Sequence, residues 1–269
     1  MSVRPAAVAG LFYPGEAREL AAFVAAFLHD ATARLPAALP VPEAVIVPHA
    51  GYIYSGPTAG FAYAAAALKG AMISRVVLLG PAHRLAFYGM ALSGYDAFAT
   101  PLGDVRLDTG AIQQLLTLPG VHVNDAAHAQ EHSLEVQLPF LQTVLGDFSL
   151  VPVCIGSVPP DAVARVIESL WGDKNTLFVI SSDLSHYHSY DEARALDRLS
   201  IDTILAMRDE LNHEQACGAT GINALLSVSG RHGLTAKLLD YRNSGDTAGD
   251  RDRVVGYASI AFYGQEKSS

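Results

Sequence analysis

The sequence predicts an α/β fold with a largely parallel central sheet flanked by helices, in a single domain over residues 1–269. Short apolar runs alternate with amphipathic segments along the whole chain, with no repeat or low-complexity linker between them. Of the 269 residues, 50% are hydrophobic and only 17% are charged. A chain this apolar, and poorer in charge than typical soluble domains, is expected to bury a large core.

The predicted strands are short, almost wholly apolar runs, as in sheets that are covered on both faces. They comprise residues 44–48, 75–80, 150–156 and 176–181, followed by two late strands at 236–244 and 254–263. The predicted helices show apolar residues at helical spacing or helix start and stop signals. They comprise residues 15–29, 55–68, 132–145, 159–172, 191–207 and 217–233. Pro57 is expected near the start of its helix, and Pro139 is expected to strain the helix over 132–145.

Charge and composition exclude several classes of protein. The chain has 18 basic and 27 acidic residues, a net charge of −9, which argues against a nucleic-acid binder. We expect no membrane span, because no stretch reaches the required run of about 18 apolar residues. Prolines and a glutamate interrupt any N-terminal signal sequence. The two cysteines are far apart and form no CxxC motif, so we expect a cytoplasmic protein without disulfides.

The strongest functional signal is the delivery of imidazoles by separate strands. His49 follows the run at 44–48, His83 follows the run at 75–80, and Asp183 and His186 follow the run at 176–181. In an open parallel sheet, ligands bind beyond the carboxyl ends of the strands. A single histidine is more often structural, but these equivalent placements predict that His49 and His83 share a site.

Two further segments offer polar side chains. His132 and Glu135 lie three residues apart at the start of a predicted helix, so they point to one side. They form either a capped polar turn, or a turn in which His132 reaches the pocket rim as a substrate contact or as a partner to a ligand. Asp246 follows a late strand and could complete a metal site with two histidines, as in non-haem Fe(II) enzymes or zinc hydrolases. The spacing does not separate the metals.

Four tyrosines, Tyr52, Tyr54, Tyr187 and Tyr241, are placed near the same pocket, where they would contact substrate or simply pack. Motifs of other enzyme classes are absent from the sequence, including GxGxxG, GxxxxGK[ST], HExxH and GxSxG.

Long motifs resemble the Memo family, called AmmeMemoRadiSam system protein B in bacteria and archaea. They are PHAGYIYSGPTAG, LLGPAHR, EHSLEVQLPFLQ, SSDLSHY and SGDTAGDRDRVVGYASIAF, and the resemblance covers nearly the whole chain. The family is similar in fold to class III extradiol dioxygenases, in which two histidines and a glutamate hold Fe(II) and another histidine is the acid/base. The resemblance implies Fe(II), with copper or zinc as alternatives.

Carried over by motif, the resemblance makes His49 and His83 metal ligands and His186 the acid/base, with Asp183 beside it. Some Memo proteins place a cysteine in the loop after the late tyrosine. Here no cysteine lies between Tyr241 and Val254, and Asp246 is the nearest suitable ligand.

These features support three hypotheses for function. The first is a metal-dependent, dioxygenase-like oxidoreductase in which His186 moves a proton and His132 and Asp183 assist. The second is a non-catalytic module that reuses the pocket for a metal, a peptide or a small molecule. The third is a zinc-type hydrolase. The resemblance also implies a functional link to radical-SAM and AMMECR-type proteins.

Overall fold

The fold is described from a computed structural model, which covers residues 1–68 and 70–264. Within these residues, the main sheet has the strand order β10-β12-β2-β9-β3-β8-β4-β7, and β11 pairs with β12. Its strands are β2 (Ala44–Val47), β3 (Arg75–Pro81), β4 (Met90–Leu92), β7 (Val121–Val123), β8 (Ser149–Ile155), β9 (Thr176–Ser181), β10 (His186–His188), β11 (Thr235–Asn243) and β12 (Val254–Tyr263).

The centre of the sheet is parallel, as predicted. Strands β2, β9, β3 and β8 run side by side in one direction. The sheet as a whole is mixed, because β12 is antiparallel to β2, and β4 is antiparallel to β8. Every residue of β2 and β9 is buried, which explains their unbroken apolar sequence.

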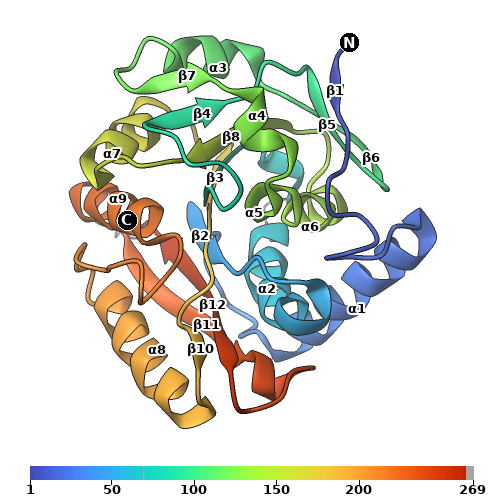
Figure 1. Cartoon of the computed structure of the whole chain (residues 1–269), viewed down its shortest axis with the longest axis vertical. Helices are drawn as coiled ribbons and strands as arrows, with labels where there is room; N and C mark the ends of the chain where they lie inside the picture. Colours follow the sequence, from blue (N-terminus) through green and yellow to red (C-terminus); the bar gives the residue numbers. More distant parts are fainter. Residues whose placement is uncertain (69, 265–269) are drawn as a thin grey trace.

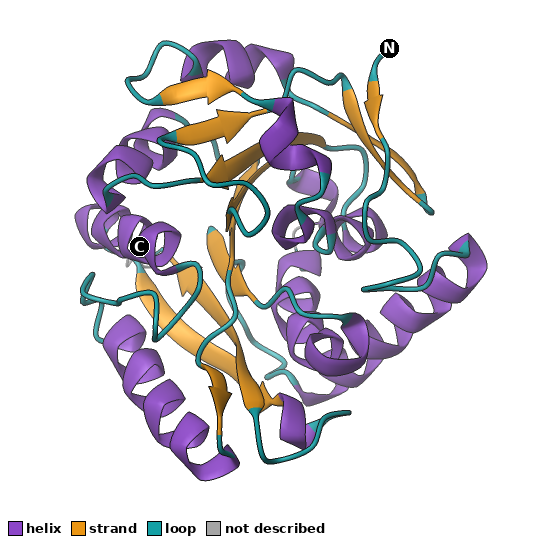
Figure 2. Cartoon of the chain, viewed as in Figure 1, coloured by secondary structure: helices purple, strands orange, loops and turns teal. Residues whose placement is uncertain are grey.

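Helices cover both faces of the sheet and confirm the α/β class (Figures 1 and 2). One group consists of α1, α2 and α6, which pack against each other, and the other contains α7 and α9; α8 packs on β11 and β12. Their bounds are α1 (Ala17–Arg34), α2 (Tyr52–Ala67), α6 (Leu138–Val144), α7 (Pro160–Ser169), α8 (Tyr190–Leu205) and α9 (Ala219–His232).

The region between residues 86 and 130 contains elements that sequence patterns do not predict. A small second sheet, in the order β1-β5-β6, joins the N-terminus to this region. The additional elements are β1 (Val3–Arg4), β5 (Ala97–Thr100), β6 (Gly103–Arg106), α3 (Thr109–Leu115) and α4 (Asp125–Ala129). Strands of two to four residues are too short to show a period of their own.

Two predicted helices that contain a proline have different boundaries in the structure. The helix expected over 132–145 is divided into α5 (His132–Glu135) and α6, and Pro139 lies in the first turn of α6. Proline has no N–H to donate to the carbonyl of residue 135, so the helix is interrupted there. By contrast, α2 begins at Tyr52 rather than near residue 55, so Pro57 lies inside the helix.

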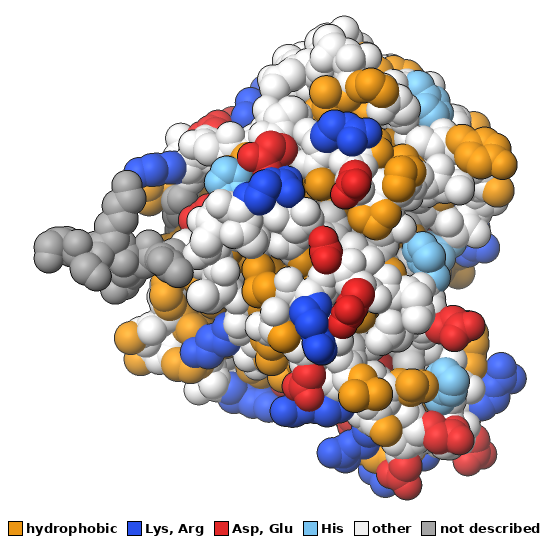
Figure 3. Space-filling model, turned by 90° about the vertical axis from the view of Figure 1, so that its left-hand side faces the viewer, with side chains coloured by type: hydrophobic (Ala, Val, Ile, Leu, Met, Phe, Trp, Pro, Cys, Tyr) orange, Lys and Arg blue, Asp and Glu red, His pale blue; other side chains and the backbone are white. Residues whose placement is uncertain are grey.

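The surface view in Figure 3 shows basic and acidic side chains interspersed over one face rather than separated by sign. Across the described residues, no helix is both long and apolar enough to cross a membrane.

A buried carboxyl group beneath β12 leads to a stability prediction. Asp197 is fully buried and accepts hydrogen bonds from the Ser185 N–H at 2.9 Å and the Tyr241 hydroxyl at 2.8 Å. Burial raises the pKa of Asp197 above its usual value. The folded protein therefore holds this proton at pH values where the unfolded chain, with a pKa of about 4, has lost it. This contribution to stability is complete below the unfolded pKa and is lost as pH rises through the folded pKa.

We expect Asp197→Asn, which cannot ionise, to gain stability relative to the wild type as pH rises from about 4 towards neutrality. Urea unfolding of both proteins at several pH values measures this difference. A difference that stays constant, or that shrinks with rising pH, would show that Asp197 ionises without penalty.

Candidate metal centre

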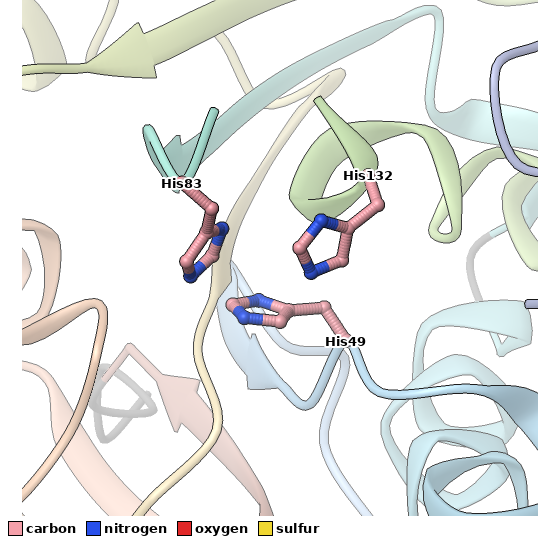
Figure 4. Close-up of side chains that lie close together, drawn as sticks. All are labelled: His49, His83 and His132. Atoms are coloured by element: carbon pink, nitrogen blue, oxygen red, sulfur yellow. The ribbon is translucent and has the colours of Figure 1, made fainter. Parts of the chain in front are cut away.

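Three imidazoles from separate segments of the chain meet at one edge of the sheet. They belong to His49, His83 and His132. Each offers one ring nitrogen as a possible metal ligand, and these three nitrogens all lie within 4.8 Å of one another. The ring centroids are 5.1 Å apart for His49 and His83, 5.5 Å for His49 and His132, and 4.7 Å for His83 and His132. Figure 4 shows the three rings turned towards a common space.

The parallel strands explain why these residues converge. His49 lies two residues beyond the end of β2, and His83 lies two residues beyond the end of β3. Both strands pair with β9, so their carboxyl ends lie at the same edge. His132 is the first residue of α5, which packs against β3.

The tautomer of His49 follows from its hydrogen bonds. Nδ1 of His49 lies 2.9 Å from Oγ of Ser181, and that hydroxyl donates its own proton to the Ser133 carbonyl at 2.6 Å. Because the hydroxyl has only one proton, it must accept from His49, so Nδ1 carries the proton and Nε2 keeps its lone pair. Nε2 of His49 therefore keeps the lone pair through which a histidine binds a metal ion, with Sγ of Cys217 lying 3.3 Å from it.

A buried amide fixes this arrangement. Nε2 of Gln137 donates to Oγ of Ser181 at 2.8 Å and to the Pro48 carbonyl at 2.9 Å. Its Oε1 accepts the hydroxyl proton of Tyr63 at 2.7 Å. The chain Tyr63–Gln137–Ser181 thus connects the core of α2 to the imidazole of His49.

Glu131 holds the other two histidines. Its carboxylate accepts the backbone N–H of His83 and lies 3.0 Å from His83 Nδ1. It also accepts the N–H groups of His132 and Ser133, at 3.0 and 2.9 Å, and caps α5. A carboxylate on Nδ1 leaves Nε2 of His83 free to bind a metal, as in many metal sites with histidine ligands.

Burial favours the neutral form of two of these imidazoles, those of His49 and His132. Burial, and then the neighbouring His83 and His132, lower the pKa of His49 well below its usual value. Burial is also the main reason that the pKa of His132 falls to about 4, although Glu131 opposes it. Burial alone would raise the pKa of Glu131, but hydrogen bonds from His83 and Ser133 outweigh it and lower the pKa to about 2. Metal binding requires neutral imidazoles.

The residues present fit a transition-metal ion. Nδ1 of His132 is buried and has no hydrogen-bond partner, although it lies 3.3 Å from Oε1 of Glu131. Ligand nitrogens about 2.1 Å from a tetrahedral ion are roughly 3.4 Å apart, so small ring movements would bring the three rings to bonding distance. Imidazole suits zinc, copper, iron and nickel, so the donor set alone does not select one metal.

A cavity of 580 Å³ opens over the three histidines. Asp183 and His186, the other residues predicted to be catalytic, also line it. Oδ1 of Asp183 accepts the His49 N–H at 2.7 Å, and burial raises the pKa of Asp183 to about 7. Burial also lowers the pKa of His186 below its usual value. Two further titratable side chains therefore line the same cavity as the imidazoles.

The structure does not bring Asp246 into this group. Its carboxylate accepts the Tyr190 hydroxyl at 2.5 Å and the Asn243 N–H at 3.0 Å, where it caps the short 3-10 helix Ser244–Asp246. Within the described chain, His132 lies beside His49 and His83 instead. We expected His132 to have a supporting role at the rim of the pocket. The structure instead places one of its ring nitrogens in the same group as those of His49 and His83.

Two of the four tyrosines placed near the pocket line the cavity, namely Tyr54 and Tyr187. The Tyr52 hydroxyl instead donates to the Val136 carbonyl at 2.6 Å, and the Tyr241 hydroxyl donates to Asp197. Glu135 is a structural residue, because its buried carboxylate pairs with Arg4 at 2.7 Å. The cap of α5 is Glu131, not Glu135.

Sequence reasoning assigned no role to two residues at this centre. Glu131 directly precedes His132, and the need of a ligating imidazole for a carboxylate partner is the signal that could have identified it. Sγ of Cys217 lies 3.3 Å from Nε2 of His49, and no local pattern indicates this contact. Cys217 precedes α9 and is 168 residues away from His49 in sequence.

Fold and site together define an α/β protein with a histidine centre at the carboxyl edge of a parallel sheet core. A family model described as "Memo-like protein" matches residues 4–261. The chain is 38% identical to a MEMO1 family protein of Ignicoccus hospitalis, over 97% of this chain and 99% of the relative. It is 37% identical to a MEMO1 family protein of Methanopyrus kandleri, over 96% and 98% of the two chains. The chain belongs to the Memo family, which confirms the resemblance of its motifs.

Among solved structures, an uncharacterised protein of Escherichia coli K12 matches 82% of this chain and 99% of its own, with a TM-score of 0.49 and 13% identity. This likeness is too low to inform function.

Proposed function

We propose that this Memo family protein is a metal-dependent oxidoreductase whose metal ion is held by His49, His83 and His132. The observation that carries the proposal is the convergence of the three imidazoles within 4.8 Å, with Nδ1 of His49 and of His83 each held by a hydrogen-bonding partner. Fe(II) is the metal that the resemblance to class III extradiol dioxygenases implies. A bound ion would bind and polarise the reacting oxygen atoms of a substrate.

The chain's own residues would divide the remaining work. His186 faces the cavity and is the side chain best suited to move a proton near neutral pH. Asp183 holds the backbone of His49 and Ala50, which fixes the loop that carries the first imidazole. Glu131 would be a positioning residue, which holds His83 and His132 by hydrogen bonds and does not touch the substrate.

A zinc-dependent hydrolase is a second candidate, and one observation favours it. Among the described residues, the group that forms the centre consists of three histidines and contains no carboxylate. Three histidines with an open position are a known set for catalytic zinc, whereas non-haem iron enzymes commonly use two histidines and a carboxylate. The choice of metal therefore has to be part of the test.

The test begins with metal content. Protein loaded anaerobically with Fe(II), and separately with Zn²⁺, is dialysed and assayed by elemental analysis. We expect about one ion per chain in the wild type and in His29→Ala, whose histidine is exposed on α1. We expect little retained metal in His49→Ala, His83→Ala and His132→Ala, because each loses one of three ligands. Circular dichroism confirms that each variant is folded.

Turnover then separates the candidates. Oxygen consumption with a catechol panel by the iron form, abolished in His186→Ala at unchanged metal content, supports the oxidoreductase. Ester or amide hydrolysis by the zinc form alone supports the hydrolase. Metal binding without either activity leaves the non-catalytic module. Failure of the folded wild type to retain any of the metals would contradict the proposal itself.

A further inference from the structure

The mouth of the cavity carries a cation that is not engaged in an ion pair. Arg253 lines the cavity, and its guanidinium lies over the ring of Tyr187, 5.1 Å from the ring centroid. Among the described residues, no carboxylate forms an ion pair with Arg253. The positive charge is therefore held in place by an aromatic ring and is free to meet a ligand.

Tyr187 is held in a conformation that tyrosine rarely adopts. Its φ is +62°, in the left-handed region, and its side chain is 64% exposed. On β10 the paired residues are His186 and His188, which are two positions apart, whereas their partners on β12 are adjacent. Tyr187 is therefore the extra residue of a β-bulge. Left-handed backbone is strained for a tyrosine, and a glycine at this position would avoid the strain. A strained, exposed side chain at a cavity mouth indicates a functional constraint.

The acidic residues that line this cavity limit the negative charge of the ligand that it can bind. Its acidic lining residues are Asp183 and Asp250. Oδ1 of Asp250 accepts the N–H of Asp252 at 3.1 Å and of Arg253 at 3.4 Å, so this carboxylate caps its own turn. Asp183 is buried on the backbone of His49. A single arginine beside two acids suits a singly charged carboxylate better than a doubly charged phosphate.

We infer that Arg253, supported by Tyr187, binds the carboxylate of a small organic anion whose other end reaches the three histidines. The inference rests on the proposed function, because it places the substrate over the metal centre. Phe12, Tyr54 and Tyr257 supply apolar walls between these polar ends. Arg253 is thereby a specificity-determining residue, and uncharged analogues of the substrate bind more weakly.

Two probes that differ only in the carboxylate test this assignment. Protocatechuate and catechol carry the same pair of hydroxyls for the metal, and only protocatechuate carries a carboxylate. Their dissociation constants are measured anaerobically by calorimetry on protein whose metal content has first been shown to be about one ion per chain. We expect protocatechuate to bind roughly tenfold more tightly than catechol, and added salt to reduce this ratio.

Arg251→Gln is the matched control, since Arg251 lies on the same loop over Tyr190 and does not line the cavity. Arg253→Gln should bring the ratio close to one, whereas Arg251→Gln should leave it unchanged. Tyr187→Gly should also reduce the ratio, because it relieves the backbone but removes the support under the guanidinium.

A ratio near one in the wild type, or an unchanged ratio in Arg253→Gln, overturns the assignment while metal retention still supports the histidine centre. Loss of metal retention in the wild type contradicts the proposed function instead. The two failures are therefore distinguishable.

Discussion

Replacing Arg4 by methionine should lower the free energy of unfolding by about 3–5 kcal/mol. Both Arg4 and its partner Glu135 are buried, with exposures of 1% and 0%. The methionine fills much of the same space but leaves the carboxylate of Glu135 without its cation. An unpaired buried charge costs far more than the pair contributes, because the interior does not solvate it.

The contacts of this ion pair explain the size of the effect. The guanidinium donates to Glu135 at 2.7 Å, to the His128 carbonyl at 2.8 Å and to the Glu131 carbonyl at 3.0 Å. The Glu135 carboxylate also accepts the N–H groups of Ala7 and Val8, at 2.8 and 2.9 Å. One substitution therefore weakens both the N-terminal segment and the backbone before His132.

Urea unfolding of Arg4→Met measures the loss, and Arg198→Met is the matched control. Arg198 pairs with Asp202 one helical turn away, with its side chain 70% exposed. Such surface pairs contribute at most about 0.5 kcal/mol. If Arg4→Met loses no more than the control, Arg4 does not neutralise Glu135 in the folded protein.

Glu131→Gln should weaken metal binding by about 10–100-fold, the usual effect of removing a carboxylate that holds a ligating histidine. Glutamine keeps the size of the side chain but removes its charge. The carboxylate accepts four donors with its two oxygens, from His83, His132 and Ser133, and in glutamine an NH₂ group replaces one of these oxygens. At best His83 Nδ1 then donates to a neutral amide oxygen instead of a carboxylate, and the NH₂ group faces the backbone N–H of His83, which it cannot accept.

The affinity is measured by competition with a chromophoric chelator. Glu168→Gln is the matched control, because Glu168 also holds an imidazole, that of His232 at 2.8 Å, but on the surface and outside the centre. The control should retain wild-type affinity. Since Arg4 binds the Glu131 carbonyl, Arg4→Met should also weaken metal binding, by less than Glu131→Gln. Unchanged affinity in a folded Glu131→Gln would show that the backbone alone positions the two histidines.

The histidine centre and the N-terminal ion pair share one short stretch of chain. The segment from His128 to Glu135 supplies a carbonyl to Arg4, the carboxylate of Glu131, the imidazole of His132 and the carboxylate of Glu135. The stability of the N-terminus and the geometry of the centre are therefore coupled.

The sequence by itself determined the α/β class, the parallel core strands and the meeting of His49 with His83. Each of these depends on local patterns. An apolar run indicates a buried strand, and the residues that directly follow the run lie at the carboxyl edge of the sheet. The same logic placed Asp183 and His186 at the cavity. It also assigned Asp246 to the centre, because that residue follows a strand and is the nearest suitable ligand in the loop where some Memo proteins place a cysteine.

Only the tertiary structure decided that His132 joins the two strand-end histidines and that Asp246 caps a turn beside Tyr190. It also decided that Glu135 belongs to Arg4, 131 residues away, and that Cys217 touches His49. These contacts join segments far apart in the chain, and their partners are selected by packing and by the need of buried polar groups for hydrogen bonds. No local periodicity encodes such a choice.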